Sequence, residues 1–141
     1  MDTNFAIGSI FSIWRTTPSK LLGESLRTQV NAVIAIFGPR TTAIYFNEKA
    51  GKVQELTALE GVKGEESAWI VSHDHLVVKP ETKIFSPGNL RAASDNLEYR
   101  EAVVGWIARG LTLRYTGGLV VDVNQILVKG HGIFSNVGSK D

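Results

Sequence analysis

The chain has 141 residues, of which 43% are hydrophobic and 21% charged, which is enough for a globular domain with its own core. Its 15 basic and 14 acidic residues nearly balance, which argues against nucleic acid as a partner because such a surface normally brings a basic excess. Cysteine is absent, which excludes a disulfide or a thiolate nucleophile within these residues and fits a reducing compartment. No apolar run approaches the roughly 20 residues of a membrane-spanning helix. Asp2 stands where a signal peptide would carry a basic residue, so we expect neither a membrane partner nor a signal peptide.

The first half of the chain predicts strands and one helix. Apolar residues alternate with others over residues 4–14, and this period of two indicates a strand. Five apolar residues then recur with helical spacing and predict a helix that stops at Gly38-Pro39. These five are Leu26, Val30, Val33, Ile34 and Phe37. The later apolar runs are strand candidates over residues 41–47, 52–59 and 68–72, and a fourth run over 76–78.

The second half predicts helices separated by short extended segments. Residues 83–93 include Pro87 and cannot form a regular helix or a central strand throughout. A helix is predicted over 97–109, capped by Asp95 and ended by Gly110. The remaining predicted elements are an extended segment at 113–115, a helix that Gly117-Gly118 opens and Gly130 closes, and a strand over 133–137.

Four stretches of the chain together carry a family pattern. In chain order they are Asp2-Thr3-Asn4-Phe5 with Gly8 and Phe11; Gly38-Pro39-Arg40-Thr41-Thr42; Phe85-Ser86-Pro87-Gly88-Asn89-Leu90-Arg91-Ala92; and a last stretch made of Leu113-Arg114-Tyr115-Thr116-Gly117-Gly118, Asp122-Val123-Asn124-Gln125-Ile126 and Gly132-Ile133-Phe134. This order resembles the class-I fructose-1,6-bisphosphatase family, in its sedoheptulose-1,7-bisphosphatase type. Residues 85–91 and the Thr-Gly-Gly run favour the sedoheptulose type over the fructose type.

The expected fold class is α/β, because strands and helices follow one another with a change of pattern near Lys83. The resemblance implies part of the layered fructose-bisphosphatase-like sugar phosphatase fold, truncated at both ends. It places residues 1–82 in the second half of the N-terminal bisphosphatase domain. Residues 83–141 then form the first half of the C-terminal bisphosphatase domain.

The resemblance also implies an activity and its surroundings. Members of the family are phosphoric monoester hydrolases that remove the 1-phosphate of a sugar bisphosphate with Mg²⁺, which acidic residues of other segments hold. The 14 acidic residues here show no converging set of the kind that Mg²⁺ prefers, so this segment is expected to bind no metal, to hold no catalytic residue and to be inactive alone. A homo-oligomer is implied for the full-length protein, and the plastid stroma of the Calvin cycle as its location, with the cytoplasm as the alternative.

Arg114 and Tyr115 are the first candidates for substrate binding. A guanidinium offers two parallel donors to phosphate oxygens, and a phenol adds another donor. By resemblance, Arg114 reaches the distal phosphate in a neighbouring subunit's site, while Tyr115 serves its own. Without the resemblance, a surface salt bridge and a core aromatic would be the ordinary interpretation.

Asn89, Arg91 and Leu119 complete the predicted substrate-binding set. The resemblance gives Asn89 and Arg91 a place near the distal phosphate, but a turn with Asn89 in a left-handed conformation remains an equal alternative. Leu119 resembles the apolar residue that lines the sugar. Asn136 stands where the fructose type has a phosphate-contacting Tyr, and no contact is assigned to it.

Other polar patterns have simpler explanations. His73 and His75 could suggest zinc, but no third ligand accompanies them, so a turn or surface pair is expected. Gly117-Gly118 could present backbone N–H groups to an anion, or could form a tight bend.

Two functional hypotheses follow. The first is the substrate-gripping part of a phosphatase that converts sedoheptulose 1,7-bisphosphate to sedoheptulose 7-phosphate and phosphate. A fructose-1,6-bisphosphatase segment is its close alternative. The second is a non-catalytic sugar-phosphate-binding or assembly module.

Overall fold

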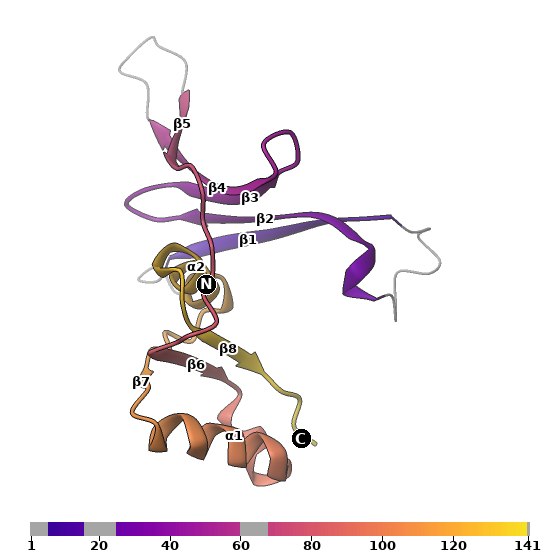
Figure 1. Ribbon diagram of the computed structural model, residues 1–141, viewed down its shortest axis with the longest axis vertical. Helices are drawn as coiled ribbons and strands as arrows, with labels where there is room; N and C mark the ends of the chain where they lie inside the picture. Colours follow the sequence, from indigo (N-terminus) through magenta and orange to yellow (C-terminus); the bar gives the residue numbers. More distant parts are fainter. Residues whose placement is uncertain (1–5, 16–24, 60–67, 141) are drawn as a thin grey trace. The chain divides into compact units, whose positions relative to one another are not determined.

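The computed structural model describes residues 6–15, 25–59 and 68–140. These residues fall into two compact units, which lie within residues 1–76 and 77–141 (Figure 1). The units are called unit 1 and unit 2 below. Among the described residues, no helix is long and apolar enough to cross a membrane.

Unit 1 is a five-stranded antiparallel sheet in which every strand pairs with its neighbours in the sequence (Figure 1). The strands are β1 (Ile7–Trp14), β2 (Gln29–Phe37), β3 (Thr42–Asn47), β4 (Lys52–Leu59) and β5 (Ala68–His73). The strands predicted over 41–47, 52–59 and 68–72 are therefore confirmed. The strand predicted over 4–14 is confirmed from Ile7 onward, and residues 4 and 5 lie outside the described residues. The run at 76–78 forms no regular strand, although Leu76 is buried and its N–H donates to the carbonyl of Val53 at 2.8 Å.

The helix predicted from Leu26 to Phe37 is wrong. A short 3-10 turn, η2 (Leu26–Thr28), leads directly into strand β2. Ile34 of this strand pairs with Ile10 on one side and with Ile44 on the other. The predicted stripe was ambiguous because β2 is apolar on both faces, and a short apolar run fits both periods. Its β-branched residues lose side-chain freedom in a helix but pack well on a pleated sheet, and two paired neighbours settle the outcome.

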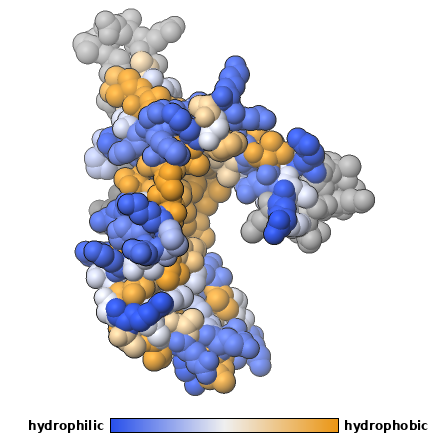
Figure 2. All heavy atoms as spheres, in the orientation of Figure 1, coloured by the Kyte–Doolittle hydropathy of each residue, from blue (hydrophilic) through white to orange (hydrophobic). Residues whose placement is uncertain are grey.

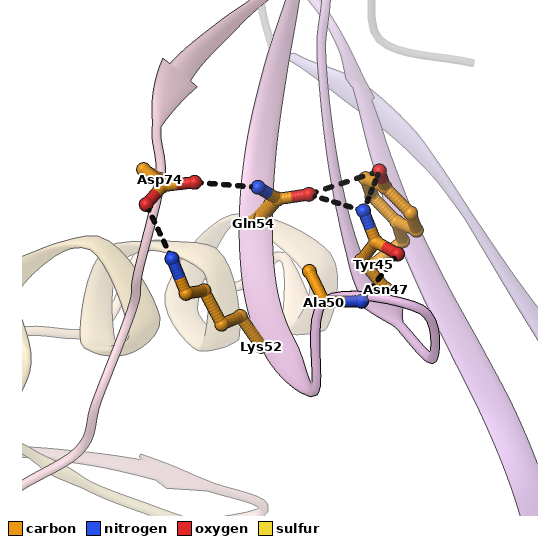
Figure 3. Close-up of polar contacts among 6 residues, drawn as sticks. All are labelled: Tyr45, Asn47, Ala50, Lys52, Gln54 and Asp74. Atoms are coloured by element: carbon orange, nitrogen blue, oxygen red, sulfur yellow. Dashed lines mark hydrogen bonds and ion pairs between the residues drawn. The ribbon is translucent and has the colours of Figure 1, made fainter.

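A polar network joins β3, β4 and the segment after β5 (Figure 3). The Lys52 ammonium and the Gln54 amide each donate to one oxygen of Asp74, both at 2.7 Å. The Oε1 atom of Gln54 in turn accepts from Asn47 at 2.7 Å and from the Tyr45 hydroxyl at 3.1 Å. The hydrogen bond from Lys52, and then that from Gln54, lowers the pKa of Asp74 from its ordinary value of 3.8. These bonds fix the end of the β3–β4 hairpin to the chain that follows β5.

Unit 2 contains a three-stranded parallel sheet with the order β7-β6-β8. Its elements are β6 (Ile84–Gly88), η3 (Leu90–Ser94), α1 (Leu97–Ala108), β7 (Thr112–Leu113), α2 (Leu119–Lys129) and β8 (Ile133–Asn136). Helix α1 connects β6 to β7, and α2 connects β7 to β8, as parallel strands require. This mixture of sheets and helices confirms the α/β fold class.

Strand β6 is central although it contains Pro87. Residues 83–93 are irregular as a whole, as predicted, but the central position of residues 84–88 was not expected. The carbonyls of Lys83 and Phe85 accept from the N–H groups of Thr112 and Arg114, at 2.8 and 2.9 Å. Alternation along the strand directs Pro87 to this same side, where β7 has already ended at Leu113. The missing N–H of the proline therefore leaves no ladder bond unmade.

The core of unit 2 lies between β6 and α1. Phe85, Ala92, Tyr99 and Val103 are buried together, and the rings of Phe85 and Trp106 lie 5.6 Å apart. The residues that pack around this cluster are Ala93, Trp106, Leu111, Ile133 and Val137. Burial of these side chains provides the main stabilisation of the unit, since apolar burial contributes about 25 cal/mol per Å².

The helix ends of unit 2 agree with the sequence except at one cap. The N-cap of α1 is Asn96, whose side-chain oxygen accepts from the Tyr99 N–H at 2.9 Å, so the predicted cap Asp95 is wrong by one residue. Asp95 instead accepts from the backbone N–H of Lys140 at 2.9 Å. Gly130 ends α2 in the left-handed conformation, as predicted, with φ of 70°.

Both units expose apolar side chains. Phe11 and Trp69 of unit 1 are 59% and 51% exposed, and Leu97 and Ile107 of unit 2 are each 60% exposed. Figure 2 shows hydrophobic patches on the face of the molecule that it draws.

Candidate functional site

A pocket of about 110 Å³ in unit 2 brings together residues from all three strand ends. It is lined by Gly88, Tyr115, Gly117, Leu119, Phe134 and Asn136. Gly88 is the last residue of β6, and Asn136 is the last residue of β8. Tyr115 and Gly117 belong to the turn between β7 and α2. The carboxyl ends of parallel strands are the usual place for ligands in open α/β sheets. We call this feature the strand-end pocket.

The turn from Arg114 to Gly118 forms one wall of the pocket. The Arg114 N–H donates to the Phe85 carbonyl at 2.9 Å, and the Ser86 hydroxyl donates to the Arg114 carbonyl. Both polar groups of the Arg114 backbone, the N–H and the carbonyl, are therefore hydrogen-bonded to residues of β6. Gly117 has φ of 86°, a left-handed conformation that favours glycine. The glycine pair thus forms the tight bend that the sequence left as one of two possibilities.

The opposite wall depends on a close approach at Gly88. A Cβ atom on this residue would lie 3.0 Å from the Ser135 carbonyl oxygen and 3.2 Å from Oδ1 of Asn136. The buried Tyr99 hydroxyl donates to the Gly88 carbonyl at 3.1 Å and lies 3.0 Å from the Ser135 hydroxyl. Tyr99 of the core therefore fastens the ends of β6 and β8 to each other beside the pocket.

The structure places three of the predicted site residues on the same turn. Tyr115 and Leu119 both line the strand-end pocket and are 48% and 40% exposed. Arg114 is also exposed, but its side chain is not part of the lining.

Asn89 and Arg91 lie outside this pocket. Asn89 has φ of 46° and ψ of 59°, which makes it the one described non-glycine residue with a positive φ. Its side-chain amide donates to the Val137 carbonyl at 2.8 Å. Arg91 lines a separate hollow of about 220 Å³. This second hollow is lined by Arg91, Ser94, Asp95 and Ser139.

A second polar cluster surrounds the buried Glu55 in unit 1. Its Oε2 atom lies 2.7 Å from both the Ser72 hydroxyl and Nδ1 of His73, and its Oε1 atom lies 3.6 Å from Arg40. A β-bulge makes this possible, because the pairing passes from Glu55 with His73 to Leu56 with Val71 and leaves Ser72 as the extra residue. The side chain of His73 is therefore paired with the carboxylate of Glu55.

The described residues do not fit a magnesium site. Among residues 6–15, 25–59 and 68–140, no three His, Cys, Asp or Glu side chains gather as metal ligands. The two fully buried carboxylates, Glu55 and Asp122, already accept hydrogen bonds from Ser72 and Thr116 respectively. Mg²⁺ requires several converging oxygen atoms, and each of these carboxylates is already bonded to a donor of its own unit.

The sequence missed four of the residues that shape the pocket. Gly88 and Phe134 belonged to recognised motifs without a role, and Asn136 had no assigned contact. Asp122 also belonged to a recognised motif without a role, although an acidic residue in the first turn of a predicted helix is a detectable signal. The roles of Gly88, Phe134 and Asn136 depend on strands that lie far apart in the sequence, whereas that of Asp122 depends on a turn six residues before it.

Comparison with known proteins shows which class of proteins this chain is similar to. Residues 78–141 match the family described as fructose-1-6-bisphosphatase, C-terminal domain. The chain is thus homologous to sugar-bisphosphate phosphatases, as the resemblance predicted. A solved fructose-1,6-bisphosphatase from Leishmania major has the same fold at 20% identity, with a TM-score of 0.64 over 88% of this chain and 41% of that one.

Among the relatives named here, those of the sedoheptulose type have the higher sequence identity. The chloroplastic sedoheptulose-1,7-bisphosphatase of Spinacia oleracea is 43% identical over 137 residues, which are 97% of this chain and 33% of the relative. A class 1 fructose-1,6-bisphosphatase of Geobacter sulfurreducens is 36% identical and is matched over 95% of this chain and 39% of its own length. A solved structure named as a sedoheptulose-1,7 bisphosphatase of Toxoplasma gondii is 38% identical with a TM-score of 0.72, covering 97% of this chain and 47% of that one. The chain therefore spans about a third of the length of the curated relatives it matches.

Proposed function

We propose that this chain supplies the sugar-phosphate-binding part of a phosphatase that converts sedoheptulose 1,7-bisphosphate to sedoheptulose 7-phosphate and phosphate. The observation that carries the proposal is the strand-end pocket, which places Tyr115 and Leu119 together beside Arg114 in a segment homologous to such enzymes. The sedoheptulose type is proposed because its relatives are 38–43% identical, compared with 36% for the fructose-type relative named above.

The chemistry of the pocket suits a phosphorylated sugar. Leu119 provides an apolar surface for the carbon chain, and the Tyr115 hydroxyl can donate to a phosphate or sugar oxygen. Arg114 contributes the charge-assisted contact with the distal phosphate, within the same subunit or across to a neighbour in a homo-oligomer. Asn89 and Arg91 complete the proposed set from the loop after β6, and the Asn89 bond to Val137 supports its turn role as well.

The distal phosphate does not react, and its binding has a positioning role. Interactions with a non-reacting group can hold the reacting phosphate in place and so contribute to the rate. The Mg²⁺ ions that the resemblance implies supply charge stabilisation and an activated water in such enzymes. Because the described residues do not fit such ions, we propose that other residues of the enzyme hold them. The chloroplastic relatives make the plastid stroma the proposed location.

Kinetics of Arg114 variants test this function. The host is a chimera in which this chain replaces the 137 matching residues of the spinach relative. If Arg114 binds the distal phosphate, Arg114→Ala removes about 1.5–3 kcal/mol. The KM for sedoheptulose 1,7-bisphosphate should then rise by roughly ten- to 150-fold at 1.4 kcal/mol per decade. Arg114→Lys should recover only part of this, because an ammonium keeps the charge but not the planar pair of donors.

Arg109→Ala is the matched control, because Arg109 is an exposed arginine of the same unit that ends α1 away from the pocket lining. It should leave KM and kcat within twofold of the unmodified chimera, a change of about 0.4 kcal/mol at 1.4 kcal/mol per decade. Unchanged KM and kcat in Arg114→Ala would contradict the proposed role of Arg114.

A further inference from the structure

Asp122 is a fully buried acidic residue that makes none of the proposed ligand contacts. It lies in the first turn of α2 and has no exposed surface. Both of its carboxylate oxygens accept from a single donor, the backbone N–H of Thr116, at 3.0 and 3.2 Å. Burying a charged carboxylate is costly, and a residue that only filled space would more favourably be apolar.

The partner of Asp122 lies in the middle of the pocket wall. Thr116 is flanked by Tyr115 and Gly117, and both of these neighbours line the strand-end pocket. The Thr116 hydroxyl accepts from the Gly118 N–H at 3.2 Å, and the Asp122 N–H donates to the Gly118 carbonyl at 3.0 Å. The side chain of Asp122 therefore holds the turn at Thr116, while its N–H makes the ordinary first hydrogen bond of the helix with Gly118.

The location of Asp122 also explains how the charge is tolerated. The first turn of a helix carries partial positive charge, which stabilises a nearby carboxylate. The N-cap Gly118 offers no side chain to the helix, and Asp122 binds the preceding turn rather than a free helix N–H. The carboxylate of Asp122 thus stabilises the turn before the helix and does not cap the N–H groups of the helix itself.

We propose that Asp122 is a positioning residue, whose carboxylate fixes the turn from Arg114 to Gly118 in the shape that receives the sugar phosphate. The anchoring follows from the contacts above, and the ligand part rests on the proposed function. A flexible turn would have to be ordered when the ligand binds, and this ordering would weaken affinity. Asp122 would then act on binding without touching the ligand.

Two measurements on the 141-residue chain test the anchoring and the ligand part separately. The first is hydrogen exchange, read by mass spectrometry, of the peptide that contains Thr116 in the absence of ligand. The second is the affinity for sedoheptulose 7-phosphate, with inorganic phosphate as a second probe. Asp122→Asn keeps the size of the side chain but replaces one acceptor oxygen by an amide without an assigned partner. We expect exchange at Thr116 to become at least tenfold faster, and affinity for sedoheptulose 7-phosphate to fall by at least tenfold.

Val103→Ala is the matched control for loss of stability. Val103 is a residue of α1 that is buried in the core beside Phe85, and it lines no part of the strand-end pocket. This variant should lower the stability of unit 2 while the folded fraction keeps its affinity for sedoheptulose 7-phosphate. An equal loss of affinity in Val103→Ala, at matched folded fraction, would overturn the positioning role. If Asp122→Asn does not fold, the milder Asp122→Glu, which keeps the charge, replaces it in both measurements and should show the same direction.

The remaining outcomes separate this inference from the proposed function. Unchanged exchange at Thr116 in the Asp122 variant would overturn the anchoring and leave the proposed function intact. Absence of binding by the unmodified chain to both probes would overturn the ligand part of the inference for this chain, while the kinetics of the chimera separately test the proposed function. Faster exchange together with unchanged affinity would show that Asp122 has a structural role only.

Discussion

The two units of this chain achieve order in different ways. In the described part of unit 1, the fully buried side chains are mostly polar, and the strands follow one another as antiparallel neighbours. In unit 2 the strands are parallel, helices connect them, and an apolar cluster around Phe85 and Tyr99 is buried between them. The first arrangement requires only local turns, whereas the second requires residues that are distant in sequence to meet.

This difference explains where the candidate site lies. In an antiparallel sheet the carboxyl ends of successive strands alternate between two opposite sides of the sheet, so the loops that follow them are divided between both sides. Parallel strands with helical crossovers place all carboxyl ends at one edge. Gly88, Tyr115 and Asn136 therefore meet in unit 2 although 48 residues separate the first from the last, while the polar cluster of Glu55 in unit 1 joins neighbouring strands.

The largest expected effect comes from comparing one phenylalanine in each unit. Phe85 is 3% exposed and Phe11 is 59% exposed. Truncating a buried phenylalanine to alanine costs about 3–5 kcal/mol, because the transfer energy is lost and a cavity remains. We therefore expect Phe85→Ala to unfold unit 2 at much lower urea concentration, as measured by hydrogen exchange of its peptides. Phe11→Ala should change the stability of unit 1 by less than about 1 kcal/mol, in line with exposed positions.

The reverse result would be equally informative. A loss in Phe11→Ala as large as that in Phe85→Ala would show that another surface buries Phe11 in solution, and would remove this contrast between the units.

A smaller effect is expected from the buried carboxylate of unit 1. Glu55→Gln retains the shape of the side chain but weakens the charge-assisted bonds with Ser72 and His73, both at 2.7 Å. Loss of such bonds to a charged group costs about 1.5–3 kcal/mol. The urea midpoint of unit 1 should fall, while Glu48→Gln in the exposed β3–β4 turn should leave it in place. A polar interior that contributes nothing would instead give the two variants equal midpoints.

The smallest expected effect concerns acid, and it should appear in both units. The pKa of Asp74 is lowered from 3.8 chiefly by its hydrogen bond from Lys52. The pKa of Asp95 is lowered from 3.8 chiefly by its hydrogen bond from the Lys140 N–H. A carboxyl whose pKa is lower in the folded than in the unfolded state stabilises the folded state at pH values above the unfolded-state pKa. This contribution is lost as the pH falls through the folded-state pKa. Asp74→Asn and Asp95→Asn should therefore flatten the fall in stability below about pH 4. Lys52→Met should reproduce the effect of Asp74→Asn, and an acid limb as steep as in the unmodified chain would contradict the assignment.

Local sequence determined much of this protein. The strand predicted at 52–59 has the observed bounds, and α2 ends at the predicted Gly130. Helix α1 ends at Ala108, shortly before the predicted Gly110, which is left-handed with φ of 73°. These features depend on alternation, capping and left-handed glycines within a few residues, and such signals act locally. The family pattern likewise lay in short motifs, and it led to the sugar-phosphatase class.

Tertiary structure alone decided the rest. Residues 29–37 fit a helix and a strand equally well by their own pattern, and pairing with β1 and β3 made them a strand. Pro87 could enter a central strand only because β7 is too short to need its N–H. Asp122 gained its role from a turn that packs back on the first turn of its own helix. In the first two cases the outcome depends on strands that pair only in the folded chain, and in the third on the shape of a turn that the local pattern does not specify.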